Sequence, residues 1–239
     1  MWNTDQLKQL KKIHHIFFTL LVSLLIFSCT EKYEGQSEGE IHFKVTYPLM
    51  DKDNFMLDML PKKMITKFKE DKMSNTLSAG MGMFKFGIMS DFEHQSIIRT
   101  AKLINKKYAL TLNNDAVFEA FKKEPTYNIQ FSNDTKTILG YECKKLIITV
   151  KDETNHNFFA YYTDKININH PNWFNQYAKI KGVLLEYEYE KYGVRMRMKA
   201  TKIHFKQLED EDFTIPESYE AVSLEKMDKE MSELFGSFQ

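Results

Sequence analysis

Methionine supplies the residues of this sequence whose type and spacing could do chemistry. The chain has 13 methionines, and eight of them lie between positions 50 and 89. Two Met-x-Met pairs, Met81 with Met83 and Met196 with Met198, could bind Cu(I), because thioethers are soft ligands that suit this ion. The alternative is that methionine fills irregular apolar space. For Met196 and Met198, alternation along a strand already places both side chains on one apolar face. We therefore expect an accommodating apolar interior and no metal site.

Other patterns typical of catalysis or cofactor binding are missing from the sequence. The histidines after residue 40 are scattered, without the His-x-x-x-His or Cys-x-x-Cys spacing of a metal site. There is no Gly-x-Ser-x-Gly elbow and no phosphate loop, and the glycines of Ala79–Gly87 (AGMGMFKFG) lack dinucleotide-binding spacing. The acidic run Glu209–Asp212 lacks the alternating ligands of a calcium loop, which favours a solvated turn. These observations predict a non-enzymatic protein without a cofactor.

The N-terminal segment combines a basic stretch, an apolar run and a cysteine. The 12-residue run Ile16–Phe27 follows three lysines. Its length matches a signal-peptide core and is too short for a helix to span a hydrocarbon layer of ~30 Å. Ser28-Cys29 after this run resembles the lipobox of bacterial lipoproteins, which implies cleavage before Cys29 and a membrane tether of acyl chains on that cysteine. An uncleaved anchor or an ordinary secretory signal is the alternative. All three predict that the rest of the chain lies outside the cytoplasm.

The only other cysteine is Cys143. If Cys29 is lipidated, Cys143 is unpaired, and a lone cysteine on a predicted strand is typically a small buried hydrophobe. If Cys29 is not lipidated, a Cys29–Cys143 disulfide is possible. Residues 29–39 are polar and aperiodic after the cysteine, so we expect a flexible tether there. No aspartate follows Cys29, which favours the outer membrane.

The charge balance argues against nucleic acid as a partner. Without residues 1–28 the chain has 30 basic and 32 acidic residues, a net charge of −2. Binding to nucleic acid or to anionic lipid headgroups depends on a basic surface. The composition provides none, so the membrane contact that we expect is the lipid anchor.

Period-two alternation of apolar and polar residues predicts an antiparallel β-protein. It occurs in five segments, residues 41–47, 108–112, 127–131, 183–189 and 194–198. Gly193 separates the last two segments and predicts a hairpin. In this hairpin Glu186, Glu188 and Glu190 take the face opposite the apolar residues. Four further dipeptides have the composition of turns: Glu70-Asp71, Asn105-Lys106, Asn133-Asp134 and Lys151-Asp152.

Two segments have helical patterns. Asp115–Lys123 has apolar residues at helical spacing, with Asn114 or Asp115 as the N-cap. Ser223–Phe235 has a longer apolar stripe, with Ser223 as N-cap and Gly236 as terminator. With no internal repeat, the simplest division is a signal peptide (1–28), a lipidated tether (29–39) and one domain (40–239).

Three segments carry a resemblance to a known family: Thr135–Lys145 (TKTILGYECKK), Phe159–Ile166 (FAYYTDKI) and Asn172–Glu190 (NWFNQYAKIKGVLLEYEYE). Together with GEIHFKVTYP and FTIPESY elsewhere, they resemble a family of uncharacterised lipoproteins of Gram-negative bacteria. That family is similar to the LolA/LolB-like lipoprotein carriers. The resemblance implies a strongly curved antiparallel sheet, an open half-barrel with helices on its concave side, where the carriers hold acyl chains. No catalytic residue comes with it.

Two functions from different classes follow. The first is a membrane-tethered module that binds a lipid or an acyl chain in the half-barrel. It predicts a cavity lined by the apolar face of the hairpin and by an aromatic loop: Val183, Leu185, Tyr187, Val194, Met196, Met198, Trp173 and Phe174. In the second interpretation Trp173 and Phe174 plug the core, and the chain is an envelope interaction or structural protein with a filled interior. A hydrolase or metal enzyme would need convergent polar residues in a cleft.

Overall fold

The computed structural model describes residues 37–51, 53–122, 124–151 and 155–236. They belong to one compact unit, Glu34–Gln239. The other unit, Met1–Tyr33, lies outside the described residues. The predicted signal peptide, Cys29 and most of the predicted tether therefore lie outside them too. The first strand begins at Glu38, slightly before the predicted domain start at residue 40.

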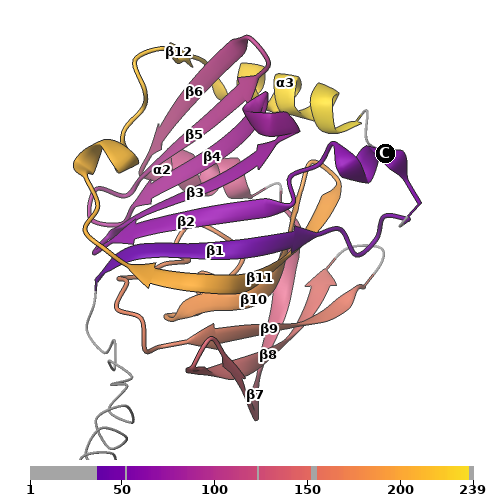
Figure 1. Ribbon diagram of the computed structural model, residues 1–239, viewed down its shortest axis with the longest axis vertical. Coiled ribbons are helices and arrows are strands. Elements are labelled where there is room, and N and C mark those ends of the chain that lie inside the picture. Colours follow the sequence, from indigo (N-terminus) through magenta and orange to yellow (C-terminus); the bar gives the residue numbers. More distant parts are fainter. Residues whose placement is uncertain (1–36, 52, 123, 152–154, 237–239) are drawn as a thin grey trace, which may run out of the picture. The chain divides into compact units, whose positions relative to one another are not determined.

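The described residues form strands, two α-helices and short 3₁₀ turns (Figure 1). The strands are β1 (Glu38–Thr46), β2 (Lys63–Lys69), β3 (Lys72–Ala79), β4 (Phe84–Asp91), β5 (Ser96–Leu103), β6 (Lys106–Asn113), β7 (Thr126–Ile138), β8 (Tyr141–Lys151), β9 (Asn157–Thr163), β10 (Val183–Lys191), β11 (Val194–Phe205) and β12 (Glu220–Ala221). The helices are α2 (Asp115–Phe121) and α3 (Leu224–Gly236), and the 3₁₀ turns are η1 (Phe55–Asp58), η2 (Gly80–Gly82) and η3 (Asp210–Phe213).

All twelve strands belong to one sheet, in the order β12-β6-β5-β4-β3-β2-β1-β11-β10-β9-β8-β7. Every neighbouring pair is antiparallel except the short parallel contact of β12 with β6. The order is linear, so β12 and β7 are the edges of a sheet that does not close. The prediction of a mainly β protein is confirmed.

The predicted hairpin is the β10–β11 pair. Its turn is formed by Tyr192 and Gly193, with φ values of 52° and 73°. Two positive φ angles in a two-residue turn fit the twist of a tight hairpin, and Gly193 accepts this geometry without a Cβ penalty. The register pairs Tyr187 with Met198 and Glu188 with Arg197. Apolar pairs and charged pairs thus alternate along the hairpin, as the sequence predicts.

One predicted turn is wrong. Asn133-Asp134 lies inside β7, at a register shift between Phe131 and Thr135. The Asp134 amide donates to Ser132 Oγ at 3.1 Å, and Lys145 Nζ contacts the Asp134 carboxylate at 2.9 Å. Turn-forming side chains here produce an irregularity within a long strand instead of a chain reversal, because β8 keeps pairing on both sides of it.

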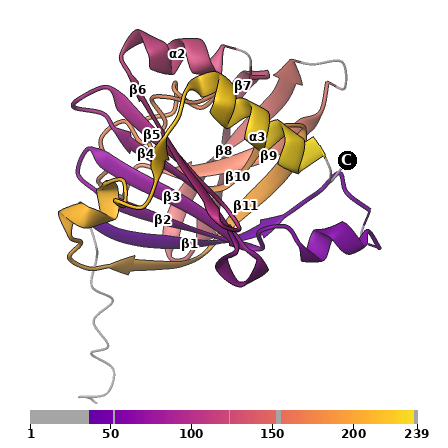
Figure 2. The ribbon, with the colours of Figure 1, turned by 90° about the horizontal axis from the view of Figure 1, so that it is seen from above.

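The two helices differ in whether the residue predicted to cap the N-terminus makes a capping hydrogen bond. Ser223 Oγ accepts a hydrogen bond from the Lys226 amide at 3.3 Å, so the predicted N-cap of α3 is confirmed. Asn114 precedes α2 with φ of 46° and makes no side-chain capping bond. Of the two predicted N-caps, Asn114 and Asp115, the structure places Asn114 at the N-cap position of α2, but without the capping hydrogen bond. Figure 2 shows α3 crossing one face of the sheet.

Apolar side chains are buried in two cores. The larger core lies between the sheet and α3 and includes Phe43, Met198 and Met227. The smaller one, formed mainly by β8, β9 and the residues before β10, includes Leu146, Ile148, Val150, Phe158, Ala160, Tyr177, Ile180 and Leu184. The burial of Leu184 in one core and of Val183 and Leu185 in the other shows that both faces of β10 are covered.

Candidate functional site

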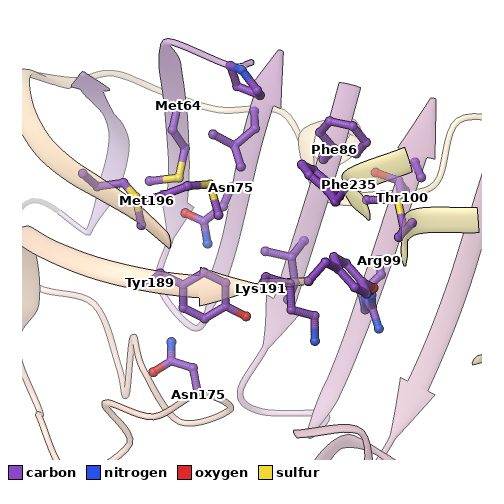
Figure 3. Close-up of a pocket in the computed structure, with 18 of the residues that line it drawn as sticks. Met64, Asn75, Phe86, Arg99, Thr100, Asn175, Tyr189, Lys191, Met196 and Phe235 are labelled. Atoms are coloured by element: carbon purple, nitrogen blue, oxygen red, sulfur yellow. The ribbon is translucent and has the colours of Figure 1, made fainter. Parts of the chain in front are cut away.

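A cavity of about 170 Å³ lies in the larger core (Figure 3). Its wall comes from β2–β5 on one side, β10 and β11 on the other, α3, and the loop that contains Phe174. Strand alternation explains the strand contributions: Leu77, Phe86 and Met196 all point to the covered face of the sheet. The wall is therefore mostly apolar.

Methionine is the characteristic residue of this wall. Five line the cavity: Met64, Met196, Met198, Met227 and Met231. They come from three different elements, β2, β11 and α3. Long, unbranched and polarizable side chains adapt their shape to what they contact. A methionine-lined cavity can thus accommodate apolar groups of differing outline.

The structure brings together four of the eight predicted cavity residues. Tyr187, Met196, Met198 and Phe174 line the cavity of about 170 Å³. Val183 lines a smaller neighbouring cavity of about 40 Å³. The other three, Leu185, Val194 and Trp173, are buried in the core and line neither cavity. They lie on the predicted apolar face, but neighbouring side chains cover them.

The aromatic loop is held firmly against the sheet. Asn172 is buried, and its Nδ2 donates to the backbone oxygens of Ile180 and Gly182 at 2.8 and 2.9 Å. These bonds close the loop at its base. The Trp173 ring lies edge-on to Phe118 and to Phe174, with centroid distances of 6.3 and 5.7 Å. Trp173 therefore packs in the core, as in the plug interpretation, while Phe174 also reaches the cavity.

Sequence reasoning missed the side of the cavity formed by β2–β5 and α3. The apolar stripe on α3 predicts Met227, Met231 and Phe235 as the buried face of a helix, and this is confirmed. Nothing in that stripe separates a side chain that fills the core from one that borders a void. Arg99 and Lys191, which also line the cavity, were missed because their charge predicts solvent exposure.

Arg99 is a buried cation in the cavity wall. Its Nη1 donates to Asp228 Oδ1 of α3 at 3.1 Å, and its Nη2 contacts the Tyr192 hydroxyl. The Tyr192 hydroxyl donates to the same carboxylate at 2.8 Å. Burial lowers the pKa of Arg99, but Tyr192 and Asp228 outweigh this effect and raise the pKa above its ordinary value. The guanidinium is thus charged and neutralised by Asp228.

Lys191 is the second cation, at the end of β10. Its Nζ forms an ion pair with Glu124, whose side chain is only 6% exposed. Glu124 also accepts hydrogen bonds from Gln176 Nε2 at 2.7 Å and from the Tyr189 hydroxyl at 3.1 Å. The carboxylate therefore has three donors from separate parts of the fold. Like Arg99, Lys191 is neutralised within the wall.

Besides the hydroxyls of Thr100 and the tyrosines, two amide side chains are polar groups that this site can offer a ligand. Asn75 on β3 accepts a hydrogen bond from Thr66 Oγ1 at 2.6 Å through its Oδ1. Asn175 Oδ1 accepts one from the Tyr177 backbone amide at 2.8 Å. Among the described residues, neither Nδ2 has a partner. Figure 3 shows both side chains at the cavity, on opposite sides of Tyr189.

Burial keeps the tyrosines of this region uncharged. It raises the pKa of Tyr187 and of Tyr189 well above the ordinary value, and nearby Glu124 raises that of Tyr189 further. The cavity therefore has neutral phenols and neutral amides between its two compensated ion pairs. No change of its net charge is expected from the tyrosines near neutral pH.

On the opposite face, the predicted glutamates form a buried ion network. Glu186 contacts Arg197 at 2.6 Å and Lys136 at 2.7 Å, and its side chain is 6% exposed. Glu188 contacts His156 at 3.1 Å. Alternation predicts the face on which these residues lie, but not that it is shielded from solvent. The residues before β10 form part of the smaller core against this end of the sheet.

The remaining candidates carry no site. Among the described residues, no group of three His, Cys, Asp or Glu side chains could hold a metal ion. Met81 is fully exposed on η2 and is separated in the chain from the cavity methionines. The acidic run near η3 is used in ion pairs with β2: Asp210 contacts Lys69 at 3.0 Å, and Asp212 contacts Lys67. The run is a largely exposed 3₁₀ turn, as predicted, and its ion pairs also fasten the chain to the sheet.

Comparison with known proteins adds no assignment. No model of a known protein family matches the chain. A search of curated proteins finds no similar sequence. Within the described part of the chain, no helix has the length and apolar character needed to cross a membrane.

Proposed function

We propose that this chain is a membrane-anchored lipoprotein of a Gram-negative cell envelope, and that its β domain binds a lipid or an acyl chain. The observation that carries this proposal is the apolar cavity of about 170 Å³ between the sheet and α3. A void of ~150 Å³ with aliphatic and aromatic walls stays dry and binds benzene. The cavity is therefore large enough for a short stretch of alkyl chain.

We propose further that the sheet is the half-barrel implied by the LolA/LolB-like resemblance, with α3 on its concave side. Ala101 of β5 and Tyr187 of β10 line the same cavity, although six strand-to-strand steps separate these strands in the sheet order. In a flat sheet six steps correspond to about 29 Å. A single cavity of this size can touch both strands only if the sheet bends, which supports strong curvature.

The lining chemistry supports a non-enzymatic module. The two cations at the cavity are neutralised by Asp228 and Glu124, and the tyrosines there are held neutral by burial. An acid–base catalyst needs a group that exchanges protons near the working pH. The wall instead offers deformable thioethers and aromatic rings, which suit binding of an apolar chain.

Native mass spectrometry of the purified full chain, with extraction and identification of lipids, tests this proposal. We expect a lipid or fatty acyl compound to co-purify at a stoichiometric level. Ala101→Leu places a larger side chain in the cavity, so it should lose the bound compound. Ala116→Leu, on an exposed position of α2, is the matched control and should retain it. A wild-type chain that stays free of lipid after incubation with lipids would refute the carrier function.

The alternative, an envelope interaction or structural protein, draws support from a different observation. Leu185, Val194 and Trp173 pack tightly in the core although they lie among the predicted cavity residues. In this interpretation the methionine-lined void is a packing imperfection. A consistently ligand-free chain in the experiment above would favour this function.

A further inference from the structure

The two cavities described above share part of their walls. Asn75, Phe174, Asn175 and Tyr187 line both the cavity of about 170 Å³ and the one of about 40 Å³. The voids are therefore neighbours, separated by two aromatic rings and two amide side chains. The shared boundary is where a chain that enters the larger void would meet polar groups.

The cations near the larger cavity cannot favour an anionic ligand. Arg99 is paired with Asp228, and Lys191 is paired with Glu124. Two positive and two negative groups leave this wall with no net charge. An additional buried carboxylate would lack a counter-ion, and uncompensated burial of a charge is strongly unfavourable.

The boundary amides instead offer hydrogen-bond donors. The Asn175 orientation is fixed, because its Oδ1 must accept from the Tyr177 amide, so its NH₂ group is the free end. The Asn75 NH₂ group is likewise left over after Thr66 donates to Oδ1. A partly buried donor without a partner favours a ligand that brings an acceptor. A carbonyl oxygen can accept a hydrogen bond from either of these NH₂ groups.

We infer that the site selects an uncharged chain bearing an ester or amide carbonyl, which accepts a hydrogen bond from Asn75 or Asn175 at the boundary between the two cavities. This inference rests on the proposed function and adds the chemical class of the ligand. The alkyl part occupies the methionine-lined cavity, and the small cavity takes the group beyond the carbonyl. Fatty-acid anions are excluded by the compensated charges.

Three probes that share an eight-carbon chain test the inference on the full chain: octane, methyl octanoate and octanoate at pH 8. The chain is labelled with ¹³C at the methionine methyl groups, since Met64, Met196, Met198, Met227 and Met231 line the cavity, whereas Met81 is exposed. Titration by NMR gives the dissociation constant of each probe. We expect methyl octanoate to bind about tenfold more tightly than octanoate, with no shift of the Met81 signal.

The variant Asn175→Asp keeps the oxygen that accepts from Tyr177 and removes the donor. We expect it to weaken methyl octanoate about fivefold relative to octane. Asn75→Asp, which keeps the bond to Thr66, should act in the same direction. Asn133→Asp introduces the same charge at an exposed position of β7 and should leave all three affinities unchanged.

The outcomes separate this inference from the proposed function. If octanoate binds as tightly as the ester, or if Asn175→Asp leaves the ester-to-octane ratio unchanged, the carbonyl selectivity is wrong while the apolar cavity remains a binding site. If none of the three probes shifts the cavity methionines, the proposed function fails together with the inference.

Discussion

Cys143 on β8 is completely buried, as expected for a lone cysteine on a strand. Burial raises the pKa of its thiol to about 11. At pH 8 only about one thiol in a thousand is then ionised, and the thiolate is the reactive form. We expect Cys143 to resist a thiol reagent in the folded chain and to react fully in denaturant. The measurement uses a Cys29→Ser background, in which Cys143 is the only cysteine; rapid reaction without denaturant would contradict this burial.

Glu40 on β1 gives a prediction about pH. Partial burial raises the pKa of Glu40, but hydrogen bonds from Lys206 and His42 outweigh this effect and hold it at about 2. A carboxyl whose pKa is lower in the folded state stabilises the fold above its unfolded pKa of about 4.5. This contribution is lost as the pH falls from about 4.5 to about 2. Near pH 7, we expect Glu40→Gln to lower the free energy of unfolding by about 1 kcal/mol.

The check is urea unfolding of wild type and Glu40→Gln at several pH values. The difference between them should shrink on acidification through this window. Glu217→Gln, at an exposed residue, is the control and should follow the wild type at every pH. A constant difference from pH 7 to pH 2 would show that the carboxylate charge is not what stabilises β1.

For single residues, the sequence predicts which face of the sheet a side chain takes better than it predicts whether that side chain is buried. Period-two alternation correctly places Glu188 and Arg197 together and opposite Tyr187. The same alternation cannot show that Glu188 is buried, since the cover of that face comes from β8, β9 and the loop before β10. Arg99 was missed for the related reason that its partner, Asp228, lies on another element.

At the scale of elements, α3 gives the clearest prediction. Met227 is buried against the sheet on the apolar stripe of this helix. Truncating a buried methionine removes apolar contacts and enlarges the void, which typically costs about 2–3 kcal/mol. We expect this loss in the free energy of unfolding of Met227→Ala, measured with urea. Lys229→Ala, at an exposed position of the same helix, should change stability by less than about 0.5 kcal/mol. Equal effects of the two variants would mean that α3 does not dock through its stripe.

The elements also show where local signals suffice. α3 begins and ends within one residue of its prediction, because capping by Ser223 and the apolar stripe agree. The β10–β11 turn was predicted for the same reason: Gly193 lies between two alternating segments. The turn predicted at Asn133-Asp134 is wrong, since turn-forming residues also occur at irregularities within a strand. Pairing with β8, which is set by the tertiary fold, decides between the two.

At the scale of the whole molecule, the position of the cavity depends on how distant elements pack together, which the sequence does not show. Tyr187, Met196 and Met198 line the cavity, as the sequence predicts. Leu185, on the same strand as Tyr187, is fully covered instead. The difference arises from how α3 and the Phe174 loop pack over the sheet. Alternation fixes which face a side chain takes, but only the three-dimensional arrangement determines where that face leaves a void.

The proposed anchor gives the last prediction, because it decides where this cavity works. If Cys29 is acylated, cells fed an alkyne-tagged palmitate should incorporate it into the full chain and retain it in the membrane fraction. Cys29→Ser should abolish both labelling and membrane retention. Cys143→Ser should keep both, since Cys143 is buried and takes no part in anchoring. Hydroxylamine cleaves thioesters but not amides, so label carried by an acyl chain in amide linkage to Cys29 should remain after this treatment.

The two alternatives left open by the N-terminal sequence give different results in the same experiment. An ordinary secretory signal would release an unlabelled chain, and an uncleaved anchor would retain an unlabelled one. In either case Cys29 would be free to pair with Cys143, but pairing would require access to a completely buried sulfur. Burial of Cys143 in the β domain therefore argues against this disulfide. An anchored domain would hold its methionine-lined cavity within reach of the lipids that it is proposed to bind.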